Sequence, residues 1–246
     1  MIDYRDLSIE QKAGFKQLFA LMLKFSQANV ISSPGFKRCL PKRNYYLSHN
    51  FDINAVKTAI EEKVVGSFDT GKEIEVLTIG AIRDYSSNIE VVKALGNKEG
   101  VKVQFVGKGG AAIKIEDYCK KEGIENVSFT GFYEKHEEAG YVKNTTFMNI
   151  FYPRIITHDT ALSNRFYNSL IYRKPMIVTK DTTQGDYAER YGVGLALETT
   201  GGLADKLKEF LKQDYAAYCE CCNSLLCDFI NDYNEFYNAV KRFISD

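Results

Sequence analysis

The residues best suited to bind a charged ligand lie between Phe151 and Leu170. A predicted strand ends near Phe151, a polar loop follows, and a helix is expected to begin near Asp159 or Thr160. The free N–H groups at a helix N-terminus can hold an anion. Arg165 would add a positive charge one turn into that helix. An amphipathic helix that only packs against a core would show the same pattern, so both interpretations stay open at this point.

Two polar residues stand beside the same predicted helix start. His158, in the loop, could hydrogen-bond a sugar hydroxyl or a phosphate, although a loop histidine without a ligand would look the same. Asn168 lies three residues after Arg165 and shares nearly the same face of a helix. With Arg165, these two residues form a candidate polar site beyond the end of a strand.

Two glycines that end predicted strands form a second group of candidates. Gly80 lets a ligand approach the backbone closely, and the forked guanidinium of Arg83 could reach a phosphate there. Gly107 begins the stretch 107–112, which fits the G-x-G-x-x-A pattern of dinucleotide-binding turns. Such a turn requires an acidic residue at the end of the next strand, and the strand that ends at Gly131 has none. An NAD site is therefore not expected.

The residues that commonly bind metals follow no pattern that predicts a site. No D-x-D pair occurs, and the histidines at positions 49, 136 and 158 share no helical spacing. The six cysteines, at 39, 119, 219, 221, 222 and 227, lack the two C-x-x-C pairs of a zinc site, so we expect reduced thiols. The sequence predicts no metal and no cofactor.

The composition narrows the functional class. The 246 residues carry 32 Lys and Arg against 32 Asp and Glu, which argues against a protein that binds by neutralising many nucleic-acid phosphates. Hydrophobic residues make up 45%, enough for a sizeable core. The polar N-terminus is no signal peptide, and the apolar stretch from Leu18 to Phe25 is too short to span a bilayer. We therefore expect a cytoplasmic location.

A parallel sheet would place the candidate residues along one edge. From residue 74 to about 200, short runs of Val, Ile and Phe alternate with helical patterns, which is typical of an α/β, Rossmann-like parallel sheet with helices on both faces. Ligands bind such sheets beyond the carboxyl ends of the strands. The predicted strands are 73–80, 101–107, 127–131, 147–151, 175–179 and 194–197. The predicted helices are 89–95, 113–121, 134–144, 161–172 and 187–191, with two more at the end of the chain.

The first 50 residues follow a different pattern. Ser8 to Gln27 is a predicted helix, with Ser8 as its N-cap and Gln11 at the capping-box position, and short strands follow at 28–33 and 45–48. Nothing before these strands completes a sheet, so the segment is interpreted as a helical remnant at the end of another domain. We expect a remnant with its hinge over residues 1–52, a Rossmann-like domain over 53–216 and C-terminal helices over 217–246.

Four stretches of the chain, in this order, resemble bacterial family-4-like glycosyltransferases, most closely those of capsular or surface polysaccharide synthesis. They are Leu77-Thr-Ile-Gly-Ala-Ile-Arg83, Val103-Gln-Phe-Val-Gly-Lys-Gly109, Val127-Ser-Phe-Thr-Gly131 and the run from Asn164 to Val178. The resemblance covers about residues 74–200 and implies a GT-B fold, with two Rossmann-like domains facing across a cleft. It implies that this chain is the C-terminal, nucleotide-sugar-binding domain with a remnant of the acceptor-binding domain.

The resemblance also implies roles for single residues. Arg83 matches an arginine that contacts the donor diphosphate, and Arg165 matches a phosphate-binding lysine. A second lysine of the family is missing, because residues 86–88 read Ser-Ser-Asn.

Thr160 and Asn168 stand where the resemblance would place two glutamates, one near the donor sugar and one at the ribose, so both carboxylates are lost. Asn168 could still hydrogen-bond a ribose. Phe132 and Tyr133 lie in the segment that receives the nucleobase. The implied site has His158 and Thr160 as candidate catalytic residues and Gly80, Arg83, Gly107, Phe132, Tyr133, Arg165 and Asn168 as donor-binding residues.

By this resemblance the activity would be transfer of a hexosyl or related group from a nucleotide-sugar to a sugar or lipid-linked acceptor, which an N-terminal domain outside this sequence would bind. The location would be cytoplasmic, at the inner face of the membrane. The lost glutamates keep a second function open, a non-catalytic nucleotide-binding or pairing domain that needs a separate acceptor-domain chain. An epimerase of the same fold is a third. A homodimer is one arrangement that would cover apolar surface, and no nucleic acid is expected as a partner.

Two expectations concern geometry. Residues 1 to about 50 should pack against the large domain or the C-terminal helices, because an isolated amphipathic helix must bury its apolar face. Arg83 and Arg165 should approach one another near the helix that begins around Asp159. Two guanidinium groups repel each other, so an anion would lie between them.

Overall fold

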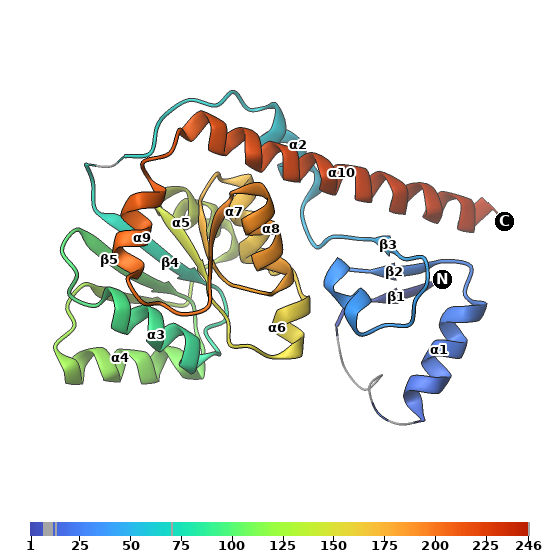
Figure 1. Ribbon diagram of the computed structural model, residues 1–246, viewed down its shortest axis with the longest axis horizontal. Coiled ribbons are helices and arrows are strands. Elements are labelled where there is room, and N and C mark those ends of the chain that lie inside the picture. The colour runs from blue at the N-terminus through green and yellow to red at the C-terminus, as the bar shows by residue number, and fades with distance from the viewer. Residues whose placement is uncertain (7–11, 13, 70, 246) are drawn as a thin grey trace.

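The chain forms a large α/β domain with a smaller α/β unit beside it (Figure 1). A computed structural model describes residues 1–6, 12, 14–69 and 71–245. The small unit holds a three-stranded sheet and the large domain a six-stranded sheet. The long helix α10 (Tyr215–Ser245) lies along the large domain and reaches the small unit (Figure 1).

The six strands of the large sheet are all parallel, in the order β6-β5-β4-β7-β8-β9. Consecutive strands run outward in one direction from β4 and in the other from β7, so the chain reverses its winding between these two strands. This is the doubly wound arrangement in which ligands bind at the switch point. All six predicted strands are confirmed: β4 (Ile74–Ile79), β5 (Val101–Val106), β6 (Val127–Gly131), β7 (Phe147–Ile150), β8 (Met176–Thr179) and β9 (Gly194–Leu197).

Helices cover both faces of this sheet, as predicted. The hydrophobic cores on the two faces contain different helices, because the side chains of each strand alternate between them. One core includes α3 (Tyr85–Leu95), α4 (Gly110–Glu122) and α9 (Leu203–Phe210). The other includes α2 (Ile53–Glu61), α5 (Glu138–Asn144), α7 (Asn164–Ile171), α8 (Thr183–Tyr191) and α10.

The helix predicted at 161–172 is found as the shorter helix α7, and a separate short helix precedes it. α6 (Ile156–Thr160) ends where that helix was expected to begin, and α7 begins at Asn164. Ser163 is the N-cap of α7, and its hydroxyl accepts a hydrogen bond from the Phe166 N–H. The prediction of a helix start near Asp159 is therefore wrong. Helix α2 was not predicted.

The small unit contains a sheet as well as helices. Its strands are parallel in the order β1-β2-β3. The segment expected to be a helical remnant is thus α/β, since β1 completes a sheet with the two strands that were predicted. Its elements are β1 (Ile2–Tyr4), α1 (Phe15–Phe25), β2 (Asn29–Ile31), the 3₁₀ helix η1 (Pro34–Arg38) and β3 (Tyr46–Leu47).

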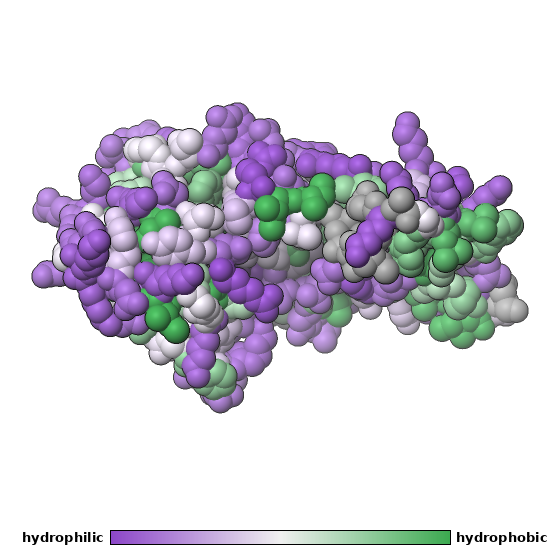
Figure 2. Space-filling view, turned by 90° about the horizontal axis from the view of Figure 1, so that it is seen from below, coloured by the Kyte–Doolittle hydropathy of each residue, from purple (hydrophilic) through white to green (hydrophobic). Residues whose placement is uncertain are grey.

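Helix α1 is apolar on its outer face as well as its inner face. Phe19 and Leu23 are buried in the small unit. The exposed side chains Leu18, Leu21, Met22 and Phe25 recur at helical spacing on the other side. Figure 2 shows hydrophobic side chains gathered at the end of the molecule formed by the small unit. The predicted cap residues Ser8 and Gln11 lie outside the described residues.

The small unit packs against the large domain, as expected. The Ser33 hydroxyl donates to the carbonyl of Thr160 in α6 at 2.5 Å. Arg38 pairs with Asp186 of α8 at 2.5 Å. Beyond β3, the buried ring of His49 lies 3.0 Å from the Tyr167 hydroxyl and 3.0 Å from the carboxylate of Asp232. These contacts join η1 and the hinge to α6, α7, α8 and α10. Strand β3 also lies beside α10 (Figure 1).

Candidate functional site

Four of the sequence-predicted residues line one cavity at the carboxyl ends of β4, β5 and β6. Gly80 and Gly107 follow the last residues of β4 and β5, and Phe132 and Tyr133 follow β6. The cavity has a volume of about 280 Å³. Its lining consists of Gly80, Ala81, Gly107, Lys108, Phe132, Tyr133 and Lys135.

The two glycines are required by the backbone at this edge. Gly80 has a φ of +99° and Gly107 a φ of +130°, which side chains rarely adopt. A Cβ atom on Gly107 would lie 1.9 Å from the Gly80 carbonyl oxygen. The ends of β4 and β5 therefore approach so closely that main-chain groups form this wall of the cavity.

Two lysines that were not predicted bring positive charge to the same cavity. Lys108 belongs to the glycine-rich stretch that was considered only as a dinucleotide fingerprint, and its ammonium group lies 5.3 Å from the ring centre of Phe132. Lys135 begins the 3₁₀ helix η2 (Lys135–Glu137) after β6. Positive charge in a hollow at a strand edge favours an anion such as a phosphate. Lys108 could have been predicted as a site residue, because it directly follows Gly107 at the end of a predicted strand.

Arg83 follows β4 beyond the cavity residues. Its side chain is exposed, and among the described residues it makes no hydrogen bond or ion pair. It is therefore available to a ligand at this edge of the sheet.

Arg165 has a different environment from the one expected. It is 8% exposed, and its guanidinium donates to the carbonyls of Ile79 and Ala81, the latter at 3.1 Å. Its charge also lies 5.6 Å from the ring centre of Tyr152. Two carbonyls and an aromatic face already stabilise this cation, so an anion between Arg83 and Arg165 is not needed to explain its position. Arg165 instead supports the backbone that leads from β4 to the site.

His158 lies at the switch point, opposite a carboxylate that was not predicted. Its Nε2 atom is 3.4 Å from Oδ1 of Asp84, and its ring stacks on Tyr152 with 4.7 Å between ring centres. Asp84 occupies the N-cap of α3, yet its side chain makes no capping hydrogen bond. An Asp at this position ordinarily accepts from the first turn of its helix. Here the carboxylate faces His158 instead. His158 lies in α6 and not in a loop as predicted, so the pair joins the start of α3 to α6.

A buried polar network holds these two loops. Asn149 of β7 donates to the Thr78 hydroxyl at 2.9 Å and to the Asn88 side chain at 3.1 Å. It also accepts from the Phe151 N–H at 3.1 Å. Asn88 donates to the carbonyl of Asp84. A buried network is rigid when its polar groups have hydrogen-bond partners. The positions of Asp84 and of the chain after β7 are therefore well defined.

Thr160 does not reach the site. It is fully buried, and its hydroxyl donates to the Ile156 carbonyl within α6. Its own carbonyl accepts from Ser33. These contacts argue against Thr160 as a catalytic residue and assign it to the junction with the small unit.

Asn168 hydrogen-bonds a protein carboxylate. Its amide donates to Glu138 at 2.5 Å, and the same carboxylate accepts from the Tyr133 hydroxyl at 3.1 Å. Burial, and then the negative charge of Glu138, raise the pKa of Tyr133 to about 12. The Arg165 charge acts on Tyr133 in the opposite direction, so these residues share one environment. No spacing in the sequence could have indicated Glu138, because it meets Asn168 only through the fold.

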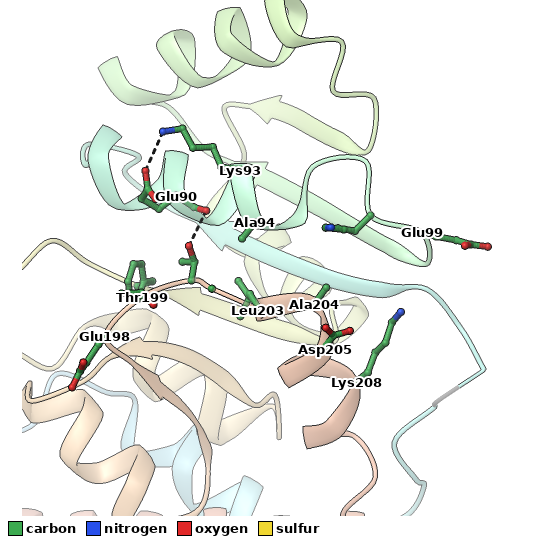
Figure 3. A pocket seen from close by; sticks show the side chains of 15 residues that line it. Glu90, Lys93, Ala94, Glu99, Glu198, Thr199, Leu203, Ala204, Asp205 and Lys208 are labelled. Atoms are coloured by element: carbon green, nitrogen blue, oxygen red, sulfur yellow. Dashed lines mark hydrogen bonds and ion pairs between the residues drawn. The ribbon is translucent and has the colours of Figure 1, made fainter.

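A larger cavity, of about 800 Å³, lies between α3 and residues 198–208 (Figure 3). Its lining mixes both signs of charge, with Glu90 and Lys93 from α3 and Asp205 and Lys208 from α9. Lys93 is already paired with Glu90 at 3.2 Å, as the figure shows. The cavity at the carboxyl ends of β4 to β6 differs from it, because no acidic residue is among the described residues that line that cavity.

Two negative findings apply to the described residues alone. Within 1–6, 12, 14–69 and 71–245, no group of three or more His, Cys, Asp or Glu side chains is placed to hold a metal ion. In the same part of the chain, no helix combines the length and apolar character needed to cross a membrane.

Comparison with known proteins identifies relatives by structure only. No family model and no curated protein matches the sequence. The structure is similar to that of HepE from Anabaena in complex with UDP, with a TM-score of 0.68 and 13% identity over 98% of this chain and 72% of that chain. It is also similar to S. aureus TarM in complex with fondaparinux, α-GlcNAc-glycerol and UDP, with a TM-score of 0.62 and 12% identity over 94% of this chain.

A third neighbour is the sucrose-phosphate synthase of Thermosynechococcus elongatus, with a TM-score of 0.64 and 11% identity. The chain spans 46% of the length of TarM, 72% of HepE and 64% of the synthase. These neighbours are GT-B glycosyltransferases. The chain therefore has the α/β fold of GT-B glycosyltransferases, with a parallel sheet covered by helices on both faces.

Proposed function

We propose that the chain is the nucleotide-sugar-binding part of a glycosyltransferase. The observation that carries this proposal is the cavity at the carboxyl ends of β4, β5 and β6, where Gly80 and Gly107 bring the backbone close and Lys108 and Lys135 add positive charge. This is the edge at which doubly wound sheets bind nucleotides. A diphosphate is the group that such a lining fits best.

The cations at this edge would also assist the chemistry. When a glycosyl group leaves a nucleotide-sugar, negative charge develops on the departing diphosphate. Arg83 and Lys108 are the side chains best placed to stabilise that charge, because the Lys135 ammonium group is already paired with Glu138 at 2.6 Å. Tyr133 and the exposed ring of Phe132 would form the side of the site nearest the nucleobase.

His158 is the proposed residue for a hydroxyl or phosphate of the substrate. Its Nε2 faces Asp84, which leaves Nδ1 as the ring nitrogen for a ligand, since Nδ1 has no partner among the described residues. The stacked Tyr152 fixes the plane of the ring. A histidine held in this way can exchange a proton with a substrate hydroxyl.

The biological setting is proposed from the resemblance in the sequence. We propose a family-4-like enzyme that transfers a hexosyl or related group in capsular or surface polysaccharide synthesis, working in the cytoplasm at the inner face of the membrane. The acceptor would be a sugar or a lipid-linked sugar held by an acceptor-binding domain. HepE has been solved with UDP and with UDP-glucose, which makes these the first ligands to test.

One observation favours the second candidate, a non-catalytic nucleotide-binding or pairing domain. Thr160 is buried and Asn168 is engaged by Glu138, so neither replaces a carboxylate beside the donor sugar. Such a domain would bind nucleotide and act only with a separate acceptor-domain chain.

Thermal unfolding in the presence of nucleotides tests the proposal and separates the two candidates. A nucleoside diphosphate or UDP-glucose at a hundred times its Kd should add about 2.7 kcal/mol to the free energy of unfolding, whereas inorganic phosphate should add far less. Release of UDP from UDP-glucose would favour the enzyme. Binding without release would fit both candidates, because the proposed enzyme also needs its acceptor-binding domain. If UDP, GDP, ADP, CDP and UDP-glucose all leave the midpoint unchanged, the proposal is wrong.

A further inference from the structure

Glu138 is a buried carboxylate held by three donors. It is 9% exposed and is the first residue of α5. Its Oε1 accepts from the Asn168 amide at 2.5 Å. Its Oε2 accepts from the Tyr133 hydroxyl at 3.1 Å and from the Lys135 ammonium group at 2.6 Å. Burying a carboxylate is unfavourable unless it is hydrogen-bonded, and these donors compensate for the loss of water.

This carboxylate stands at the boundary of two cavities. Two of its partners, Tyr133 and Lys135, line the 280 Å³ cavity assigned to the diphosphate. Glu138 itself lines a neighbouring cavity of about 350 Å³, together with Lys135 and Asn168. Lys135 thus belongs to both, and a ligand that extends out of the first cavity past Lys135 meets Glu138.

The charge and the acceptor positions of Glu138 determine which ligand group can hydrogen-bond to it. A carboxylate has about four acceptor positions on its two oxygens, and three are occupied. A phosphate would be repelled by its negative charge, whereas a hydroxyl could donate to the remaining position. In a nucleotide, the hydroxyl-bearing group next to the phosphates is the pentose. In the NAD sites of doubly wound sheets, an Asp or Glu carboxylate accepts from the ribose 2′-hydroxyl.

We propose that Glu138 is a ribose-binding residue that accepts a hydrogen bond from the 2′- or 3′-hydroxyl of the nucleotide. The inference rests on the proposed function. Asn168 and Tyr133 then act on the ribose through Glu138, as positioning residues, and the direct contact between Asn168 and ribose expected from the sequence is not required. The carboxylate is supplied by α5, on the chain that follows β6.

Isothermal titration with ribose and deoxyribose nucleotides tests this inference. The ligand is whichever of UDP, GDP, ADP and CDP binds the protein most tightly, compared with its 2′-deoxy and 3′-deoxy counterparts. Glu138→Gln keeps the shape of the side chain and removes its charge. It should weaken binding of the ribonucleotide about tenfold or more, as expected for a hydrogen bond to a charged group. At least one deoxy counterpart should bind the wild type about tenfold more weakly than the ribonucleotide does. On Glu138→Gln the same deoxy nucleotide should bind as tightly as the ribonucleotide.

Two controls keep the outcomes distinct. Glu122→Gln changes an exposed glutamate at the C-terminal end of α4 and should leave every affinity unchanged. Thermal unfolding without ligand shows whether Glu138→Gln remains folded. Nucleotide binding that is unaffected by Glu138→Gln, or equally weakened for ribose and deoxyribose forms, would overturn the ribose assignment alone. No binding of any nucleotide to the wild type would overturn the proposed function and this inference with it.

Discussion

The carboxylate of Asp84 lies 3.4 Å from the imidazole of His158, across the point where the sheet reverses its winding. Asp84 follows β4 at the start of α3, and His158 lies in α6 after β7, so the pair joins the two segments that flank the switch point. Asp84 leaves the first turn of α3 without a side-chain cap to make this contact. A capping residue typically contributes about 1 kcal/mol to its helix. The chain thus forgoes a local stabilising contact in order to orient a histidine at the candidate site.

The buried position of Arg165 predicts a role in stability. Arg165→Ala leaves the carbonyls of Ile79 and Ala81 without their donor, so the free energy of unfolding in urea should fall by about 1–3 kcal/mol. Arg43→Ala, at an exposed position, should change it by less than about 0.5 kcal/mol. Equal stability of the two variants would show that the guanidinium does not support the end of β4.

The junction between the small unit and the large domain predicts an intolerant glycine. A Cβ on Gly35 would lie 2.0 Å from the Thr183 hydroxyl and 2.4 Å from the Thr160 carbonyl. Gly35→Ala should therefore destabilise the protein by about 1–3 kcal/mol, as overpacking does. Gly140→Ala, where the added methyl group meets open space inside α5, should stabilise it by about 0.5–1 kcal/mol. Chemical denaturation of both variants checks the contrast, and a neutral Gly35→Ala would contradict the docking of η1 on α6 and α8.

The raised pKa of Tyr133 predicts a loss of stability in alkali. Its pKa is about 12 in the folded protein and 10 in an ordinary environment, so above pH 10 the unfolded chain releases a proton that the folded chain keeps. The protonated Tyr133 hydroxyl therefore contributes fully to the free energy of unfolding below pH 10, and this contribution is lost as the pH rises through 12. The free energy of unfolding in urea is measured for the wild type and for Tyr133→Phe at pH values from 9 to 12. As the pH rises over this range, the wild type should lose more stability than Tyr133→Phe. A difference that stays constant with pH would mean that Tyr133 titrates normally.

The orientation of α1 predicts opposite outcomes for two neighbouring residues. Leu23 is 2% exposed and Phe25 is 75% exposed. Leu23→Ala should lower the free energy of unfolding by about 2–5 kcal/mol, and Phe25→Ala should change it by less than about 0.5 kcal/mol. If Phe25→Ala is the more destabilising change, the outer face of α1 is covered in solution. The expected homodimer is one way to cover it, and light scattering of the same samples would show it.

The parts of the fold that the sequence predicted correctly depend on local patterns. The six strands of the large sheet are short apolar runs bounded by glycines or polar residues, and each was found where the run lies. The start of α7 was placed too early, because Ser163 was not recognised as an N-cap and the apolar spacing continues across it. β1 was missed because only Ile2, Asp3 and Tyr4 form it, and its partners lie beyond α1.

The candidate site was predictable only in part, for the same reason. Gly80 and Gly107 could be predicted from the neighbouring sequence, because each follows a strand at a position with a positive φ. The contacts of Asp84 with His158 and of Glu138 with Asn168 join residues 74 and 30 positions apart, as the residue numbers show. Arg165 was predicted to bind a ligand anion. In the structure its guanidinium donates to main-chain carbonyls, which the sequence does not indicate.

One titration measures whether nucleotide binds at the carboxyl ends of β4 and β5. The affinity of UDP, or of the nucleoside diphosphate that binds best, is measured for the wild type, for the double variant Arg83→Ala with Lys108→Ala, and for Arg43→Ala. We expect measurable binding to the wild type and no change in Arg43→Ala. The double variant should lose at least about tenfold in affinity, because two charged contacts are removed. Binding of equal strength to the wild type and the double variant, or no binding to the wild type, would contradict the proposed nucleotide site.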